Sequence, residues 1–103
     1  MKKIVIALLV CFALLRVSAA DLNWLTDLPK AQAQAKIENK LVLLDFTGSD
    51  WCGWCKKLDA ETFSKSEFAD YAVKNLVLVQ LDYPNKKPQS DDLKKANAAL
   101  QKI

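Results

Sequence analysis

Residues 41–47 read Leu-Val-Leu-Leu-Asp-Phe-Thr, and residues 51–55, just beyond them, read Trp-Cys-Gly-Trp-Cys. The first segment is almost continuously apolar, which is typical of a strand covered on both faces in a parallel sheet. Residues 47–50, Thr-Gly-Ser-Asp, predict a turn, and a helix is expected from about residue 52 to 62. A Cys-x-x-Cys pair on the turn between a buried strand and a helix indicates a redox site.

The first twenty residues have the layout of an export signal. Lys2 and Lys3 form a basic n-region, residues 4–15 an apolar h-region, and residues 18–20 a small-residue cleavage site. The apolar stretch is shorter than the roughly 20 residues that span a bilayer. We therefore expect cleavage after Ala20, a periplasmic or secreted product, and no membrane association afterwards. An uncleaved signal that tethers the protein is the alternative.

The charge of the chain is concentrated in that signal. Lysine and arginine number 15 against 12 aspartate and glutamate, a net charge of +3. Lys2, Lys3 and Arg16 all lie within or beside the expected signal, so the 12 remaining basic residues balance the 12 acidic ones. A balanced chain gives no argument for binding nucleic acid or an anionic membrane.

Residues 21–103 are expected to form one small domain, because they are too few for two cores. Beyond the signal, Cys52 and Cys55 are the only cysteines, and the chain has no histidine. So close a pair gains little as a structural staple, which stabilises by closing a long loop. It could be half of a zinc site, but structural zinc needs about four ligands. We expect no metal, and no cofactor besides a redox-active Cys52–Cys55 disulfide.

The rest of the chain predicts an α/β architecture. A second apolar run, residues 76–83, predicts another buried strand. Flanking segments predict an irregular lead-in over 21–28, a loop over 84–88, and helices over 29–39, 66–74 and 90–102. The order helix, strand, helix, helix, strand, helix favours parallel strands joined by right-handed crossovers.

Caps and inward faces follow from the same pattern. The expected helix caps are Asp27, Ser49 or Asp50, and Ser66. The expected inward residues are Ala31, Ala35 and Ile37 in the first helix, Phe68, Tyr71 and Ala72 in the third, and Leu93, Ala96, Ala99 or Leu100 in the last. The aromatic residues Phe46 and Phe63 are also expected in the core.

The spacing of the two cysteines suits thiol–disulfide exchange. Residues three apart on a helix share one face, so Cys52 and Cys55 can close a disulfide across one turn. Cys52 is expected at the helix N-terminus, where free N–H groups and the helix dipole favour a thiolate. We predict that Cys52 attacks a substrate disulfide and that Cys55 resolves the mixed disulfide.

Asp45 lies inside the first apolar strand. Burial disfavours the charged form of a carboxyl group, so its pKa is expected to be raised. It could then accept the proton of Cys55 during resolution. Alternatively, Asp45 points to a strand end and accepts a hydrogen bond from a backbone donor.

Trp51, Gly53 and Trp54 surround the first cysteine and are the predicted substrate-binding residues. Large rings at such a junction either fill the space between sheet and helix or form an exposed apolar rim that grips a peptide. We expect Trp51 to be the packed ring and Trp54 the exposed contact.

Residues 43–58, Leu-Leu-Asp-Phe-Thr-Gly-Ser-Asp-Trp-Cys-Gly-Trp-Cys-Lys-Lys-Leu, resemble the active-site segment of the thioredoxin superfamily. The chain is most similar to exported bacterial thioredoxin-like proteins related to the soluble domains of disulfide reductases, over about residues 24–103. This resemblance implies the thioredoxin fold and thiol–disulfide exchange, with Cys52 as nucleophile, Cys55 as resolving thiol, and Asp45 as the family's buried acid. It also implies protein thiol or disulfide substrates and an upstream electron donor or acceptor.

The sequence departs from the family pattern in three places. The loop between Asp45 and Cys52 is one residue longer than in classical thioredoxins, and Gly53-Trp54 replaces the familiar Gly-Pro between the cysteines. The family's cis-proline, following β-hairpin and last helix have no counterpart. We therefore expect a chain truncated at its C-terminus, with an exposed strand edge that makes residues 21–103 marginally stable or aggregation-prone. A partner that completes the sheet is the alternative.

The favoured function is a periplasmic thiol–disulfide oxidoreductase that acts on protein disulfides, with reduction preferred over oxidation. One alternative is a non-catalytic thioredoxin-like module that binds partners through Trp54 and an exposed edge. Another is a metal carrier that uses both thiolates.

Overall fold

The computed structural model describes residues 18–103 of the 103-residue chain. The expected signal therefore lies outside the described residues, except for its last three positions, and the domain boundary after Ala20 stays a prediction. Within the described part, every helix is too short or too polar to span a bilayer.

Nine elements follow one another along residues 18–103. They are the 3₁₀-helix η1 (Ala19–Asp21), β1 (Trp24–Leu25), α1 (Leu28–Glu38), β2 (Leu41–Thr47), α2 (Gly53–Leu58), the π-helical turn η2 (Asp59–Phe63), α3 (Ser66–Asn75), β3 (Leu76–Asp82) and α4 (Asp91–Leu100).

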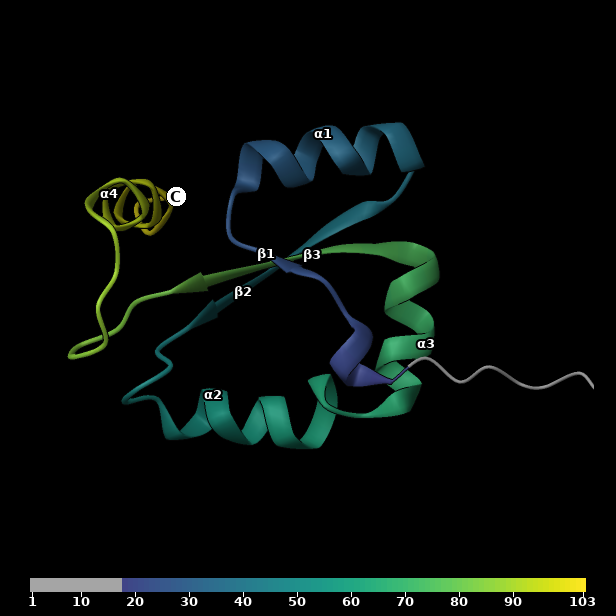
Figure 1. The fold of residues 1–103 in the computed structure, drawn as a ribbon, viewed down its shortest axis with the longest axis horizontal. Coiled ribbons are helices and arrows are strands. Elements are labelled where there is room, and N and C mark those ends of the chain that lie inside the picture. Colours follow the sequence, from purple (N-terminus) through teal and green to yellow (C-terminus); the bar gives the residue numbers. More distant parts are fainter. Residues whose placement is uncertain (1–17) are drawn as a thin grey trace, which may run out of the picture.

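The strands form one parallel sheet in the order β1-β3-β2. Helix α1 covers one face of this sheet, while α2 and α3 lie on the other (Figure 1). The predicted α/β class with parallel strands is therefore confirmed. The sequence-based expectation missed β1, a strand of only two residues inside the lead-in.

The main core lies between α1 and the central strand β3. Side chains of a strand alternate between its faces, so Val77, Val79 and Leu81 point together toward α1. They pack there against Ala31 and Ala35, and all five are at most 5% exposed. Burying a Val or Leu side chain contributes roughly 1.5–3 kcal/mol, so this row fixes α1 on the sheet.

A second, aromatic cluster holds the opposite face together. The ring of Trp24 from β1 lies 5.2 Å from that of Phe63 at the end of η2. Phe63 lies 5.0 Å from Phe68 of α3, while Ala69 and Ala72 of that helix are buried. These contacts connect the end of the α2–η2 helical segment to the sheet.

The ends of α1 agree with the sequence-based prediction, but one inward residue does not. Asp27 caps the helix by accepting a hydrogen bond from the backbone N–H of Lys30 at 3.1 Å. Asn39 ends it in the left-handed region, at φ 55°. Ile37 was expected inside and is exposed, because it lies about 200° around the helix from Ala35.

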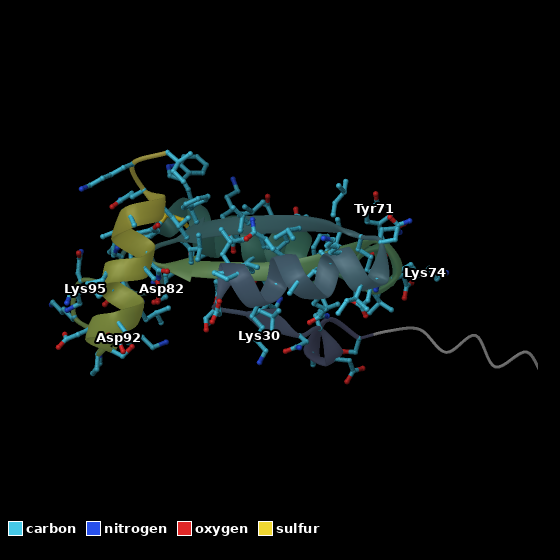
Figure 2. The ribbon with its side chains drawn as sticks, turned by 90° about the horizontal axis from the view of Figure 1, so that it is seen from above. Lys30, Tyr71, Lys74, Asp82, Asp92 and Lys95 are labelled. Atoms are coloured by element: carbon cyan, nitrogen blue, oxygen red, sulfur yellow. A yellow bond between two sulfur atoms is a disulfide. The ribbon has the colours of Figure 1, made fainter. Side chains whose placement is uncertain are left out.

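Two expectations for α3 are also wrong. The N-cap is Lys65 rather than Ser66, and it makes no side-chain capping bond. Tyr71 is exposed because Ala69 and Ala72 take the face toward the sheet. Figure 2 places Tyr71 and Lys74 at the end of the molecule opposite to α4.

The continuous apolarity of β2 predicted a strand covered on both faces, and this prediction is wrong. Strand β2 is the edge strand, and Leu41 and Phe46 are 75% and 48% exposed. In the parallel register, Val42, Leu44 and Phe46 align with Val77, Val79 and Leu81 on the α1 face. Val42 packs against the core beneath α1. Leu44 and Phe46, further along the same row, are exposed.

Helix α4 packs through a residue that the sequence reasoning did not select. Asn97 is buried, whereas Ala96 and Ala99, two of the expected inward residues, are exposed. The Nδ2 of Asn97 donates to the backbone carbonyl oxygen of Asp82 at 3.1 Å. The backbone carbonyl oxygen of Asn97 accepts a hydrogen bond from the Tyr83 hydroxyl at 2.7 Å. These bonds hold α4 at the carboxyl end of β3, where Figure 2 shows Asp82 beside it.

Candidate active site

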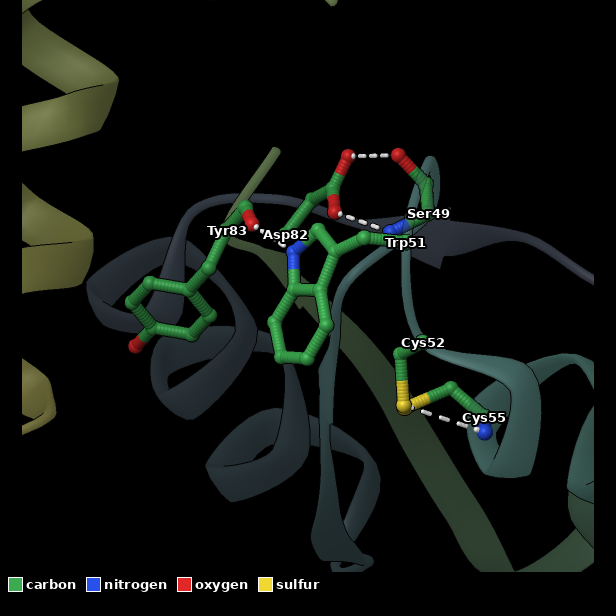
Figure 3. Close-up of a disulfide and its surroundings, with 6 residues drawn as sticks. All are labelled: Ser49, Trp51, Cys52, Cys55, Asp82 and Tyr83. Carbon is green, nitrogen blue, oxygen red and sulfur yellow. Dashed lines mark hydrogen bonds between the residues drawn. A yellow bond between two sulfur atoms is a disulfide. The ribbon is translucent and has the colours of Figure 1, made fainter. Parts of the chain in front are cut away.

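Cys52 and Cys55 are joined by a disulfide at the first turn of α2 (Figure 3). Their Cα atoms are 5.3 Å apart, and both residues are partly buried. Cys52 is the N-cap of the helix, and its Sγ accepts a hydrogen bond from the Cys55 backbone N–H at 3.2 Å. One of the backbone N–H groups in the first turn of α2, that of Cys55, therefore already points at the Cys52 sulfur, which favours negative charge there.

The expected caps, Ser49 and Asp50, do not cap α2. Ser49 instead contacts Asp82 at the end of β3. Its backbone N–H and its hydroxyl donate to the two carboxylate oxygens of Asp82, at 2.9 and 2.6 Å (Figure 3). The carboxyl ends of two neighbouring parallel strands are thereby tied together directly before the cysteine motif.

Asp50 makes a second connection to the same region. Its carboxylate accepts the backbone N–H groups of Asn85, Lys86 and Lys87 at 2.7–2.8 Å. These hydrogen bonds lower the pKa of Asp50 to about 2, and the one from Asn85 contributes most. Asp50 therefore stays ionised down to strongly acidic pH and holds the loop after β3 against the active-site loop.

Trp51 supplies a third connection. Its Nε1 donates to the carbonyl oxygen of Tyr83 at 2.7 Å (Figure 3). Its indole also lies so close to Gly48 that a Cβ at that position would collide with it. Trp51 is still 55% exposed, so it is fixed in position while one side stays open to solvent.

Trp54, between the two cysteines, is the most open ring of the site. It is 80% exposed, as expected for a contact residue. The Nζ of Lys57 lies 5.3 Å from the centre of its ring and 3.9 Å from a carboxylate oxygen of Glu61. Gly53 is exposed, and a Cβ there would meet no atom within 4 Å.

Asp45 lies on the α2 side of the sheet. Its register partner is Gln80 of β3, and their side chains interact. Burial raises the pKa of Asp45, and repulsion from Asp59 adds to the shift, whereas the Gln80 hydrogen bond opposes it. Asp59 is four residues after Cys55 and shares its helical face, so Asp45 faces the same side of α2 as Cys55. No hydrogen bond joins Asp45 to either cysteine within residues 18–103.

A shallow hollow opens beside Cys55. It has a volume of about 210 Å³, and its wall includes Phe46, Trp51 and Tyr83. The rings of Phe46 and Tyr83 are nearly parallel, with centroids 6.3 Å apart. A larger cavity of about 640 Å³ lies between α1 and α4, with no cysteine in its wall. The hollow next to the disulfide is therefore the concave surface relevant to cysteine chemistry.

The sequence reasoning overlooked Asp82 and Tyr83 as parts of the site. They follow a buried strand next to β2, and polar groups at the carboxyl ends of adjacent parallel strands lie close together. The position of Asp82 and Tyr83 at the end of a predicted strand could therefore have identified them as site residues.

Residues 23–100 match the family model described as thioredoxin-like. The chain belongs to the thioredoxin-like family. The resemblance to the thioredoxin superfamily is thereby confirmed. A solved structure titled DsbH oxidoreductase confirms the predicted fold, because it superposes on this chain with a TM-score of 0.75 at 35% identity. That similarity covers 82% of this chain and 58% of the solved one.

Similar curated proteins carry names from disulfide chemistry. The disulfide bond reductase DsbH of Chlamydia pneumoniae is 36% identical over 84 residues, which are 82% of this chain and 50% of the relative. The thioredoxin-related protein DsbJ of the same organism is 29% identical, over 95% of this chain and 30% of its own length. The thiol:disulfide interchange protein DsbD of Vibrio cholerae is 38% identical, over 70% and 12%. The chain thus spans half the length of DsbH and a smaller share of DsbJ and DsbD.

Proposed function

We propose that this protein is a thiol–disulfide oxidoreductase that acts on protein disulfides outside the cytoplasm. The observation that carries the proposal is the Cys52–Cys55 disulfide at the first turn of α2, with the Cys52 sulfur in the N-cap position. The relatives named as a disulfide reductase and an interchange protein support it. A periplasmic location rests on the signal-like sequence of residues 1–20.

The reaction needs only the two cysteines and the substrate. In the reduced protein, the Cys52 thiolate attacks one sulfur of a substrate disulfide, whose other sulfur leaves as a thiolate and takes up a proton. Cys55 then loses its proton and attacks the Cys52 sulfur, which breaks the mixed disulfide. Two electrons pass to the substrate, which leaves as a dithiol, and the Cys52–Cys55 disulfide forms. Oxidation of a substrate is the reverse sequence.

Asp45 is the proposed proton acceptor for Cys55. Its raised pKa brings a carboxyl group closer to the thiol range, as general-base catalysis requires. Its place on the α2 side of β2, under the helical face of Cys55 and Asp59, supports this role. A water molecule between the Cys55 thiol and the Asp45 carboxylate can carry the proton from one to the other.

The substrate is proposed to lie across Trp51, Gly53 and Trp54. The exposed ring of Trp54 and the hollow beside Cys55 offer apolar contact to a peptide. Gly53 has no side chain, so a peptide backbone can approach the Cys52 sulfur closely. A second protein is needed to restore the starting redox state after each cycle.

A redox titration of the full-length protein in glutathione buffers tests the proposal. Free thiols are trapped with an alkylating reagent and counted by intact mass. We expect one two-electron transition, and a potential near about −270 mV would mark a reductant, whereas one near about −120 mV would mark an oxidant. Thiols that titrate without a discrete transition would contradict the proposal.

Single cysteine variants assign the two roles. We expect Cys52→Ser to abolish exchange, because Cys55 lacks the helix N-terminal position. Cys55→Ser should accumulate a mixed disulfide between Cys52 and the substrate, visible by mass spectrometry without reductant. Full exchange activity in Cys52→Ser would exclude Cys52 as the nucleophile.

A binding module without catalysis is the second candidate. The 80% exposure of Trp54 and the 48% exposure of Phe46 favour it, since both rings are available to a partner. The variant with both cysteines replaced by serine separates the two functions. Partner binding that survives in this variant, combined with no exchange activity in the parent protein, would favour the binding module.

A further inference from the structure

Asp45 and Gln80 form a cross-strand pair on the α2 face of the sheet. They are register partners on the neighbouring parallel strands β2 and β3. Because neighbouring strands lie only about 4.8 Å apart, the side chain of Gln80 reaches the carboxylate of Asp45 and forms a hydrogen bond with it. An ionised carboxylate only accepts hydrogen bonds, so the Nε2 of Gln80 is the donor.

The neighbours of this pair along the two strands differ from it. Leu43 and Leu78, the preceding pair on the same face, are apolar, and Leu78 is buried. Asp82, two residues after Gln80, is also on this face, and its carboxylate accepts hydrogen bonds from the active-site loop. Gln80 therefore lies between the apolar part of the sheet and the loop that leads to the cysteines, directly beside the carboxyl group proposed as proton acceptor.

The groups around Asp45 act on its charge in opposite directions. Burial and the carboxylate of Asp59, the C-cap of α2, both disfavour a negative charge on Asp45. Asp82 adds a further negative charge on the same face of β3, and the Cys55 thiol on α2 is neutral until it gives up its proton. The hydrogen bond from Gln80 is the interaction that favours the ionised carboxylate. Gln80 is itself exposed, so a substitution there leaves the core intact.

We propose that Gln80 is a positioning residue for the resolution step, because its amide holds the Asp45 carboxylate ready to accept the proton of Cys55. This inference rests on the proposed thiol–disulfide exchange with Asp45 as proton acceptor, and it adds a residue that acts through Asp45.

This role requires a particular pH dependence. An acceptor has to be ionised before it can take a proton. Without the Gln80 donor, burial and Asp59 act unopposed, so the pKa of Asp45 rises further and the carboxyl group stays protonated to higher pH. Resolution should then slow at pH values below the pKa of Asp45 and recover above it. A damaged fold would instead slow the step at every pH.

The resolution step is measured with the full-length reduced protein and dithiobis(nitrobenzoate), an aromatic disulfide whose thiolate is coloured. Cys52 attacks the reagent and releases a first thiolate at a rate that depends on the reagent concentration. Cys55 then attacks the Cys52 sulfur and releases a second thiolate at a rate that does not. Stopped-flow absorbance separates the two phases, and the pH midpoint of the second phase is the quantity to compare.

Three substitutions of Gln80 should move this midpoint in a fixed order. Gln80→Met keeps the length of the side chain but has no N–H group, so the midpoint should rise. Gln80→Glu adds a negative charge and should raise it further, by about one pH unit above the wild-type value. Gln80→Lys places a cation beside the carboxylate and should lower the midpoint below the wild-type value.

The carboxyl group itself is followed independently. Carbon NMR of the Asp45 side chain in the oxidised protein, in which the cysteines do not titrate, should show the same order of midpoints. In an Asp45→Asn background, the Gln80 variants should no longer move the midpoint of the second kinetic phase, because the group through which they act is gone.

The matched controls carry the same three substitutions at Gln32, an exposed residue of α1, the helix on the other face of the sheet (Figure 1). They change the side-chain shape and the net charge equally. Both midpoints should stay at their wild-type values in these controls. Equal shifts in the Gln32 and Gln80 variants would assign the effect to net charge and overturn the inference.

The outcomes separate this inference from the proposed function. If the wild-type protein releases both thiolates but the carboxyl midpoint is the same in all Gln80 variants, the role of Gln80 is wrong and the exchange reaction stands. A carboxyl midpoint that shifts while the kinetic midpoint stays fixed would also overturn it, because Asp45 would then not control resolution. Release of only the first thiolate by the wild-type protein would overturn the exchange mechanism and the inference with it.

Discussion

Gly48 and Gly53 flank the same turn, but their surroundings differ. A Cβ on Gly48 would enter the indole of Trp51, the ring that donates to Tyr83. A Cβ on Gly53 would meet nothing within 4 Å. Neither glycine has a positive φ angle. Packing against Trp51, rather than backbone conformation, is therefore the reason for glycine at position 48.

The two alanine variants test this difference. We expect Gly48→Ala to destabilise the protein by about 1–3 kcal/mol, because the Trp51 ring has to move out of its packed position. Gly53→Ala should be neutral or stabilising by up to about 1 kcal/mol, since alanine is favoured in a helix. Urea unfolding measures both. Equal stability of the two variants would contradict the packing explanation for Gly48.

Asp45→Asn tests the buried carboxyl group. The folded pKa of Asp45 is raised, so its neutral form is favoured and stability falls as pH rises through that pKa. The uncharged asparagine avoids this loss. We therefore expect Asp45→Asn to be more stable than the wild type at pH 7, with the difference vanishing near pH 3. The urea midpoint at both pH values measures this, and a lower midpoint at pH 7 would contradict it.

The same substitution should slow the resolution step. Without the carboxylate, Cys55 has to give its proton directly to water. We expect the mixed disulfide on Cys52 to decay on the order of 100-fold more slowly, the low end of general-base contributions. Quenched-flow alkylation with mass analysis measures its lifetime. An unchanged lifetime would assign Asp45 a structural role only.

At the scale of elements, the loop after β3 depends on the ionisation of one side chain. The pKa of Asp50 is lowered because three backbone N–H groups stabilise its charged form. A lowered pKa stabilises the fold above the unfolded value and loses that contribution as pH falls through the folded value. The attachment of the loop should therefore persist at pH 4 and fail near pH 2.

Amide proton shifts report this titration directly. We expect the N–H resonances of Asn85, Lys86 and Lys87 to move together with a midpoint of about 2 in an NMR pH series. In Asp50→Asn these shifts should stay constant over the same range. A midpoint near the ordinary aspartate value would mean that the three hydrogen bonds do not hold the carboxylate in solution.

The elements themselves were largely predictable from sequence, and the contacts between them were not. Strand β2 and the helix after Cys52 followed from local apolar runs and turn residues, which depend on near neighbours. Ser49 and Asp50 were read as local caps, but both bind residues more than 30 positions away. A polar turn residue next to a helix looks the same in the sequence whether it caps that helix or binds a distant loop.

Burial was the other property that the sequence could not supply. The apolar run of β2 predicts a strand but not its place in the sheet. As the edge strand, it leaves Leu41 and Phe46 exposed. Asn97 was passed over because a polar residue is rarely buried, yet it is buried because its side chain and backbone bind the end of β3.

At the scale of the whole molecule, strand β2 forms an open edge of the sheet. It pairs with β3 on one side, and no strand within residues 18–103 pairs with the other. Its unpaired N–H and C=O groups stand next to exposed apolar side chains. Such an edge is a template for strand addition, so copies of this chain should associate through β2.

Leu44→Lys tests this self-association. A lysine on an edge strand opposes strand pairing, because two copies would bring like charges together. Leu58→Lys on α2 is the matched control, since Leu58 is 44% exposed and Leu44 37%. Light scattering over a concentration series should show association in the wild type and in Leu58→Lys, and less in Leu44→Lys. If both lysine variants reduce association equally, general apolar exposure rather than the β2 edge is its cause.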